Sequence, residues 1–479
     1  MARSLTPPES SDRPAAPPSR AGYVLGLLFV GNLLNFYDRA LPSVVLEPIK
    51  DEFGLDDTQV GILASAFVLV AALAGVPLGR LADRVPRAAV AGWGLFVWSA
   101  FTAAGGLLTS FWGFFASRVG VGVGESSYAP ATGSLLSDLY PSERRSRAHS
   151  LFMLGFPVGT LLAFLTAGGL AVAFDSWRAP FLIAALPGFV VALLVLRIRE
   201  PGRGAADPVG DVQVADVQVG NVPVGEVPVA REPLAADGPV GTRHPAPGGR
   251  GGSTLRALLK VRSMYGMLLA FAGYNFAAYA IGTFLTPVLQ RYYGLSLVGA
   301  GLVGGVVVGV TGLIGLFAGG RLLDRAARRS SEARVRAAAL SLAGAAVFSF
   351  AGLLAGRGAL WQLVAFLSLG YLLGVVYLAA AVPVVSDVIR PEQRSGALGL
   401  LFAVGYLLGG AGGPVLVGML SDALAGGAQS ASEASAHGLR TALTLTVPLA
   451  FGVAAAGMLL ASRSVRGDRE AMLAAANTP

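Results

Sequence analysis

The sequence predicts an all-α integral membrane protein in which twelve transmembrane helices form two six-helix bundles. Of its 479 residues, 54% are hydrophobic and only 13% are charged, and its mean hydropathy is +0.64. Soluble domains carry about 25% charged residues. Apolar runs of about 20 residues, each long enough to cross the hydrocarbon core of a bilayer, recur along the chain. A set of landmarks also appears twice, which indicates two related halves.

The repeat is carried by short sequences between apolar runs. Residues 79–84, Gly-Arg-Leu-Ala-Asp-Arg, recur as residues 320–325, Gly-Arg-Leu-Leu-Asp-Arg. The pair Ser137-Asp138 recurs as Ser386-Asp387 at a nearly constant offset. A duplicated unit of this length, built from membrane spans, is typical of a two-halved secondary transporter.

The apolar runs define the transmembrane helices in order. In the first half we expect spans at residues 22–46, 59–80, 88–109, 112–137, 148–172 and 179–197. In the second half we expect spans at residues 262–289, 297–321, 334–355, 359–387, 396–420 and 439–461. They group into an N-terminal bundle at residues 21–199 and a C-terminal bundle at residues 255–463.

Three segments lie outside the bundles. Residues 1–20 are rich in Pro, Ser and Arg and have no apolar core, so they predict a disordered tail and not a cleaved signal peptide. Residues 200–254 contain four five-residue near-repeats with alternating Val. Their Gly and Pro content argues against a stable sheet and predicts a disordered tether. Residues 464–479 form a C-terminal tail.

The distribution of basic residues predicts the orientation. The loops after spans 2, 4, 8 and 10 carry fourteen Lys and Arg residues, whereas the loops after odd-numbered spans carry five. Loops rich in basic residues stay in the cytoplasm. We therefore expect both termini, the tails and the linker to be cytoplasmic, and the protein to reside in a bacterial inner (plasma) membrane.

Composition also excludes several function classes. The chain has no cysteines, and its three histidines, His149, His244 and His437, fall in loops or the linker, so no metal site is expected. No catalytic Ser/His/Asp grouping lies within the spans and no phosphate-binding loop is present, which argues against an enzyme or an ATP-driven pump. Topology explains the net charge of +8 better than nucleic-acid binding does. We expect a monomer without cofactors.

Ionisable residues inside the membrane are the first functional candidates, because an unpaired charge there costs several kcal/mol. Four stand out: Asp38 and Arg39 in span 1, and Arg118 and Glu125 in span 4. A helix rises about 1.5 Å per residue, which places Asp38 and Arg118 at a similar depth and Glu125 roughly 10 Å deeper. The depths predict an Asp38–Arg118 pair and leave the partner of Arg39 open.

These four residues suggest a route to proton coupling. Desolvation strengthens proton binding by a carboxylate, and a nearby arginine weakens it. We hypothesise that Asp38 and Glu125 carry the proton, while Arg39 and Arg118 set their proton affinity and contact an anionic headgroup. The alternative is a static salt-bridge cluster joining spans 1 and 4, with Arg118 structural and Arg39 neutralising the surroundings of Asp38.

The repeated loops are candidates for a cytoplasmic gate. Asp83 with Arg84, and Asp324 with Arg325, occupy related positions in the two halves. We hypothesise that each aspartate accepts hydrogen bonds from a neighbouring helix N-terminus and pairs with a loop arginine, which holds the cytoplasmic side shut. The alternative is that the arginines are only topology signals.

The second half offers neutral residues for lining a cavity. These candidates are Tyr274, Asn275, Tyr279, Tyr371, Tyr377 and Tyr406. An uncharged aromatic half beside a charged half suits an amphiphile with a polar head and an apolar tail, whereas the alternative for each tyrosine is packing. Pro157 in span 5, and Gly405 and Gly409 in span 11, predict bending and close packing of those helices.

The motif at residues 79–84, repeated at 320–325, resembles the signature of the major facilitator superfamily, although Pro86 and Ala88 depart from the usual loop pattern. The resemblance implies two six-helix bundles that open alternately to each side. Residues 35–39, Asn-Phe-Tyr-Asp-Arg, and residues 118–125, Arg-Val-Gly-Val-Gly-Val-Gly-Glu, resemble the spinster-like branch. That branch implies proton-linked transport of lysolipid-like or sphingoid amphiphiles.

Two other functions stay open. The same fold with a different cavity would export drugs or small organic anions. A receptor or scaffold that does not transport belongs to another class, and accumulation of a ligand against its gradient would exclude it.

Overall fold

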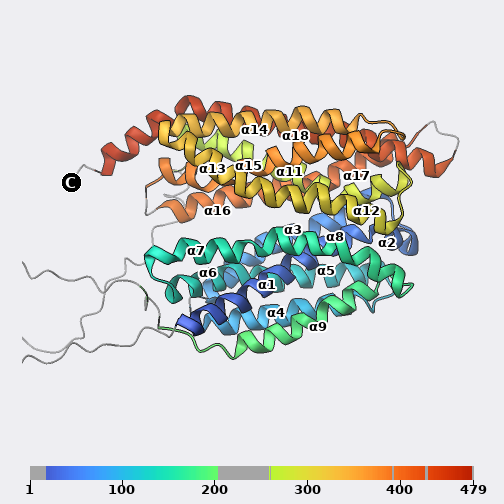
Figure 1. Ribbon diagram of the computed structural model, residues 1–479, viewed down its shortest axis with the longest axis horizontal. Coiled ribbons are helices and arrows are strands. Elements are labelled where there is room, and N and C mark those ends of the chain that lie inside the picture. Colours follow the sequence, from blue (N-terminus) through green and yellow to red (C-terminus); the bar gives the residue numbers. More distant parts are fainter. Residues whose placement is uncertain are drawn as a thin grey trace, which may run out of the picture.

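The computed structural model describes residues 18–82, 84–202, 206, 258, 260–390, 393–426 and 430–476. Within these ranges every regular element is a helix. Two groups of helices lie side by side with their axes along the long dimension of the molecule (Figure 1). Residues 1–17 of the tail predicted at residues 1–20 and most of the predicted linker lie outside the described residues, whereas residues 18–20 already belong to the first helix.

The N-terminal bundle carries the first six spans. Its helices are α1 (Pro18–Val44), α2 (Leu46–Phe53), α3 (Asp57–Ala82), α4 (Arg87–Gly105), α5 (Phe111–Ser126), α6 (Tyr128–Leu139), α7 (Ser142–Met153), α8 (Gly155–Ala173) and α9 (Ala179–Leu196). The short α2 ends at Phe53 and is capped by Gly54, whose φ of 62° is the left-handed conformation that glycine adopts at helix C-termini. We call the end of the molecule where α1 begins the terminal end, and the end where α2 lies the far end.

The C-terminal bundle carries the other six spans. Its helices are α11 (Arg262–Arg291), α12 (Leu297–Gly304), η1 (Gly305–Val310), α13 (Thr311–Arg329), α14 (Ser331–Leu353), α15 (Leu360–Val388), α16 (Arg394–Val404), η3 (Gly405–Ala411), α17 (Gly412–Leu424) and α18 (Ala431–Ala476). Ten of the predicted spans coincide with helical runs of the described chain that are long and apolar enough to cross a membrane. Span 1 is α1, and span 4 is α5 together with α6.

Several spans are interrupted where their sequence weakens the helix. Span 5 breaks at Leu154, three residues before Pro157, because proline cannot donate the hydrogen bond that would continue the helix. Spans 8 and 11 contain the π-helical turns η1 and η3, of which η3 begins at Gly405. Span 5 is thus interrupted near Pro157 and span 11 takes a π-helical turn at Gly405, and π-helical turns often mark functional regions.

The last helix continues well beyond its apolar part. The predicted tail at residues 464–479 is helical as far as Ala476. The Asp468 carboxylate accepts a hydrogen bond of 2.7 Å from the backbone N–H of Ser263, at the start of α11. This contact satisfies one of the donors that a helix N-terminus leaves unpaired, so the tail is part of the C-terminal bundle.

An ion pair between an arginine and an aspartate recurs at related positions in the two bundles, in agreement with the repeat seen in the sequence. In the N-terminal bundle the buried Arg87 pairs with Asp138, and its Nε lies 3.2 Å from Glu200. In the C-terminal bundle Arg334 pairs with Asp387 at 3.1 Å. Each pair joins the start of one span to the end of another at the terminal end, so it braces its own bundle.

The two bundles pack against each other toward the far end. One apolar cluster is continuous from Val44, Ile49 and Leu63 of the N-terminal bundle into the C-terminal bundle. The part of the N-terminal bundle nearer the terminal end has a separate cluster around Trp98 and Leu135. Among the described residues, the hydrogen bonds between bundles lie on this far-end side. The structure is therefore closed at the far end.

Candidate functional site

An ion pair between the first and fourth spans forms the centre of the candidate site. The Arg39 Nε atom on α1 donates to Glu125 Oε2 on α5 at 2.6 Å. The arginine side chain is 27% exposed, whereas the glutamate side chain is fully buried. The Arg39 guanidinium also lies over the rings of Phe36 and Phe67, at 5.0 and 5.4 Å. The partner of Arg39, which the sequence left open, is therefore Glu125.

The predicted ion pair between Asp38 and Arg118 is wrong for this conformation. Both side chains are buried and interact electrostatically, but no ion pair joins them in the described chain. Asp38 accepts a long hydrogen bond, 3.4 Å, from Thr102 of α4, and the Trp98 indole lies beside the same carboxylate. The Arg118 guanidinium lies instead over the rings of Phe114 and Phe181, at 5.5 and 5.1 Å, where cation–π attraction compensates part of its desolvation.

Tyrosines of the C-terminal bundle face this charged group. Tyr279 and Tyr406, which are partly exposed, are electrostatic neighbours of Arg39 and contact each other with ring centroids 6.3 Å apart. Tyr274 and Tyr377 are buried and pack together at 5.6 Å. The sequence therefore located an aromatic group that the fold does bring together opposite the charges.

The other two cavity candidates are also buried. Tyr371 is only 7% exposed and is an electrostatic neighbour of Tyr274. Asn275 is buried, and its amide donates to the carbonyl of Phe271 one turn earlier on the same helix, at 2.8 Å. One of its two N–H donors is therefore used within α11, and the side chain is buried, which makes Asn275 a weaker candidate for substrate contact than the partly exposed Tyr279.

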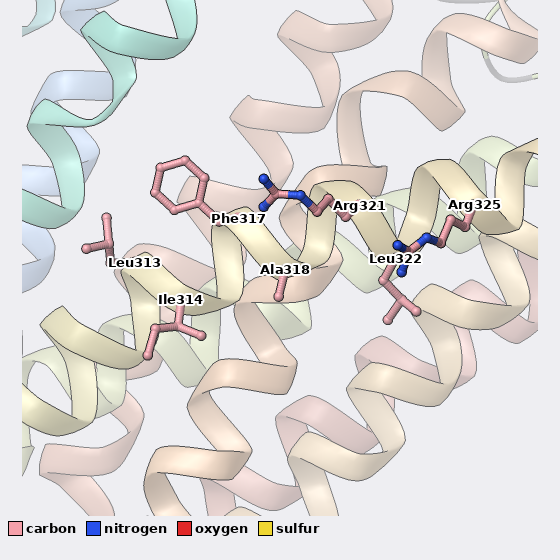
Figure 2. Close-up of a pocket in the computed structure, with 7 residues that line it drawn as sticks. All are labelled: Leu313, Ile314, Phe317, Ala318, Arg321, Leu322 and Arg325. Atoms are coloured by element: carbon pink, nitrogen blue, oxygen red, sulfur yellow. The ribbon is translucent and has the colours of Figure 1, made fainter.

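In the second half, the residues of the proposed gate do not form it in this conformation. Asp83 lies outside the described residues, and Arg84 is exposed just after α3. Asp324 and Arg325 are exposed on α13, and no ion pair joins either of them to another described residue. Arg325, Arg321 and Phe317 line a hollow along that helix (Figure 2). The gate stays a prediction for a state in which the terminal end is closed.

Sequence reasoning missed an ion-pair network that joins the bundles at the far end. Arg291, at the end of α11, donates to both carboxylate oxygens of Glu47 at 3.0 and 2.9 Å and to both of Asp57 at 2.9 and 2.8 Å. Lys50 pairs with the same Asp57 at 2.6 Å. We call Glu47, Asp57 and Arg291 the far-end lock. Arg291 had been counted only as a loop charge, although it was one of few basic residues on that side.

The start of α3 is also held by the other bundle. The Asp422 carboxylate on α17 accepts hydrogen bonds from the backbone N–H groups of Asp57 and Thr58, at 3.1 and 2.8 Å. Ser421 donates to Asp57 at 2.6 Å. An α-helix normally receives such a cap from its own chain neighbours. Opening of the far end must therefore break a helix cap as well as the lock.

Helices α3 and α17 pack closely where the two bundles meet at the far end. We call this contact the α3–α17 seam, and a substitution tests it directly. A Cβ atom on Gly418 would overlap the carbonyl group of Asp57. We expect Gly418→Ala to destabilise the far-end-closed state by about 1–3 kcal/mol, as overpacking does, and to raise the reactivity of a cysteine placed at Ser421. Gly412→Ala on the same helix is the control, because nothing lies within 4 Å of its Cβ position. Equal reactivity in both variants would refute the role of this seam.

A further ion pair at the far end lies within one bundle. Arg178 donates to Glu52 of α2 at 2.6 Å, and Trp177 donates to the same carboxylate at 2.6 Å. These hydrogen bonds, chiefly the one from Arg178, hold the pKa of Glu52 below its usual value. Both partners are partly exposed, so this pair contributes less to stability than a buried pair. It attaches α2 to its own bundle.

Comparison with known proteins agrees with this architecture. The family profile described as Major Facilitator Superfamily matches residues 28–414. An "MFS-type efflux pump" of Mycolicibacterium smegmatis is 31% identical over 460 residues, which cover 94% of this chain and 95% of that protein. The sphingosine-1-phosphate transporter SPNS2 of Danio rerio is 27% identical over 83% of this chain and 76% of its own.

A solved structure is similar over almost the whole chain. It is a bacterial homologue of the human lysosomal transporter spinster, described as inward-facing and unoccupied. Its TM-score is 0.78 at 26% identity, and the match covers 95% of this chain and 99% of that one. The same homologue in an occupied, inward-facing form gives a TM-score of 0.76.

Proposed function

The chain belongs to the Major Facilitator Superfamily, and on that premise we propose that it moves a lysophospholipid-like or sphingoid-like amphiphile across the membrane by proton-coupled alternating access. The observation that carries the proposal is the Arg39–Glu125 pair facing Tyr279 and Tyr406 of the other bundle. One side of the site offers charge, and the other offers aromatic surface with hydroxyl groups. An amphiphile with a polar head and an apolar tail fits this combination.

Competition for Arg39 gives a mechanism for coupling. An anionic headgroup that binds Arg39 takes the arginine away from Glu125. The carboxylate, without its partner in a buried position, then binds a proton, because an isolated charge is costly there. When the headgroup leaves, Arg39 pairs with Glu125 again and the proton is released. Glu125 and Asp38 are the proton carriers in this scheme, and Arg118 sets their affinity.

The orientation follows from the basic loops. We propose a bacterial inner membrane location with both termini in the cytoplasm. The terminal end then faces the cytoplasm and the far end faces outward, so a structure closed at the far end is inward-facing. The likeness to a homologue described as inward-facing supports this assignment. Labelling that located the two chain ends on opposite faces of the membrane would refute it.

Transport measured in liposomes tests the proposed function. The purified protein is reconstituted, and uptake of lysophospholipids, a sphingoid base and hydrophilic organic anions is followed with and without a pH gradient. We expect accumulation of an amphiphile that depends on the gradient. Equal uptake with and without the gradient would refute coupling, and uptake of hydrophilic anions alone would refute the substrate class.

Export of drugs or small organic anions is the second candidate. It is favoured by the 31% identity to a protein named as an efflux pump. The same substrate panel distinguishes it, because drug export requires transport of compounds without a lipid tail. A receptor or scaffold, which belongs to another class, would bind a ligand without accumulating it.

We expect the hydroxyl group of Tyr279 to form a hydrogen bond with the bound substrate. We expect Tyr279→Phe to raise KM for the amphiphile about 3- to 10-fold with little change in kcat, because a neutral hydrogen bond contributes about 0.5–1.5 kcal/mol. Tyr23→Phe is the control, since Tyr23 is 56% exposed on α1. Initial uptake rates over a range of substrate concentrations measure both constants. An unchanged KM in Tyr279→Phe would remove this residue from the site.

A further inference from the structure

A group of buried polar side chains lies beside the Arg39–Glu125 pair, within the N-terminal bundle. We call it the inner polar cluster, and it consists of Asp38, Trp98, Thr102, Arg118 and Glu125. These residues come from α1, α4 and α5, and none is more than 4% exposed. So many polar groups buried together require partners, because each unsatisfied one costs about 1–3 kcal/mol.

Five atoms of the cluster have no hydrogen-bond partner in the described part of the chain. They are Asp38 Oδ1, Glu125 Oε1, Trp98 Nε1, Arg118 Nε and Arg118 Nη2. The two oxygens are acceptors when ionised, and the three nitrogens are donors. The set is therefore complementary, although its members do not bond to one another.

The side chains of the cluster act on one another electrostatically. Both carboxylates act electrostatically on Arg118, yet neither forms an ion pair with it among the described residues. The Trp98 indole lies beside Asp38 and is held by edge-to-face packing on Tyr128, with ring centroids 5.3 Å apart. A bound species must accept from Trp98 and Arg118 and donate to Asp38 and Glu125.

Water is the species that meets these requirements. An anion would be repelled by the two carboxylates, and a cation by the Arg118 guanidinium. A water molecule both donates and accepts, and buried waters typically make about three hydrogen bonds to groups that would otherwise be unsatisfied. The donors and acceptors present match that pattern.

We propose that the inner polar cluster binds one or more water molecules, which carry the proton between Glu125 and Asp38, with Trp98 as the residue that positions them. The inference rests on the proposed proton coupling. In the step, the O–H bond of protonated Glu125 breaks and a water molecule accepts its proton. The water then gives a proton to the Asp38 carboxylate. Glu125 becomes ionised, Asp38 becomes neutral, and the water is regenerated.

The contacts of Glu125 indicate from which side the proton reaches Asp38. Glu125 contacts the partly exposed Arg39 through Oε2, while its Oε1 belongs to the cluster. Glu125 thus lies between the partly exposed Arg39 and Asp38. The charged and titratable groups around Asp38 are Arg118 and Glu125 on α5, and Tyr37 and Arg39 beside it on α1. Arg118 and Glu125 contribute to the same proposed water site as Asp38.

Infrared difference spectroscopy between acidic and neutral pH tests the proposal on the full chain in membranes. Spectra are recorded in ordinary water and in water labelled with oxygen-18. We expect O–H stretching bands of bound water that shift with oxygen-18, together with carboxyl bands of the proton carriers. Trp98→Phe should remove the water bands, because it deletes the N–H donor and keeps the ring. Trp93→Phe on the same helix is the control, since Trp93 is 57% exposed.

The outcomes separate this inference from the proposed function. Carboxyl bands without any band sensitive to oxygen-18 would overturn the water site and leave proton coupling intact. The absence of carboxyl bands would overturn proton coupling itself. Water bands that are identical in Trp98→Phe and the unsubstituted protein would overturn the role of Trp98. If Trp98→Phe does not fold, the oxygen-18 comparison on the unsubstituted protein still decides whether water is bound.

Discussion

Replacement of Glu125 by glutamine is expected to abolish the dependence of transport on the pH gradient. Glutamine has the shape of a protonated glutamate but cannot release a proton. A gradient of one pH unit supplies about 1.4 kcal/mol per proton, which is about tenfold in accumulation. We therefore expect gradient-driven accumulation in Glu125→Gln to fall by at least about tenfold per pH unit. Uptake into proteoliposomes at several imposed gradients measures the effect.

Substrate exchange shows whether Glu125→Gln still binds and moves its substrate when no proton gradient is used. Counterflow, in which labelled substrate exchanges with unlabelled substrate, needs no net proton movement, so we expect it to persist in Glu125→Gln. Glu470→Gln is the matched control, because Glu470 is exposed and, in the described ranges, its one ion pair is with Arg466 one turn away. Gradient-driven transport that is unaltered in Glu125→Gln would refute the proton role of this residue.

The second large effect is expected at the far-end lock. Arg291 is mostly buried and bonds to Glu47 and Asp57 of the other bundle. Removing one partner of a buried ion pair costs about 3–5 kcal/mol. Because that cost falls on the far-end-closed state, we expect Arg291→Gln to shift the conformational equilibrium toward opening of the far end by at least about tenfold. Arg291→Lys, which keeps the charge, should have a smaller effect.

Distances between spin labels measure this shift. The chain contains no cysteine, so labels can be attached to cysteines introduced at Leu107 and Leu354, which are exposed at the far end of the two bundles. In Arg291→Gln the distance distribution should gain a longer component. Arg178→Gln is the control, because it breaks an ion pair within one bundle. Identical distributions in Arg291→Gln and the unsubstituted protein would show that the lock does not hold the bundles together.

The transmembrane helices could be predicted from the sequence because apolar length alone determines them. Ten spans coincide with long apolar helices, and the two others fit α1 and the pair α5 and α6. The π-helical turns in spans 8 and 11 could not be predicted, since they depend on how neighbouring helices pack. The contact between the extended α18 and the start of α11 could not be predicted either, because it also depends on tertiary packing.

The sequence identified the ionisable residues of the candidate site but not which of them form an ion pair. Rise per residue gives the depth of a side chain, so Asp38 and Arg118 were assigned to the same level. It does not give the direction around the helix axis. Neighbouring residues such as Asp38 and Arg39 point about 100° apart, and here Arg39 faces Glu125 while Asp38 faces Thr102 of α4. Pairing depends on which helix lies in each direction, and that is a property of the tertiary fold.

The contact between Asp468 and the start of α11 ties the last part of α18 to the helix that carries two of the proposed substrate-contacting tyrosines. Helix α11 carries Tyr274 and Tyr279, and its first turn is supported by a residue in the last part of α18, which ends at Ala476. Shortening the protein before Asp468 would fray that turn and loosen the helix that presents both tyrosines. Peptide tags are therefore safer after Ala476 than in place of the final helical turns.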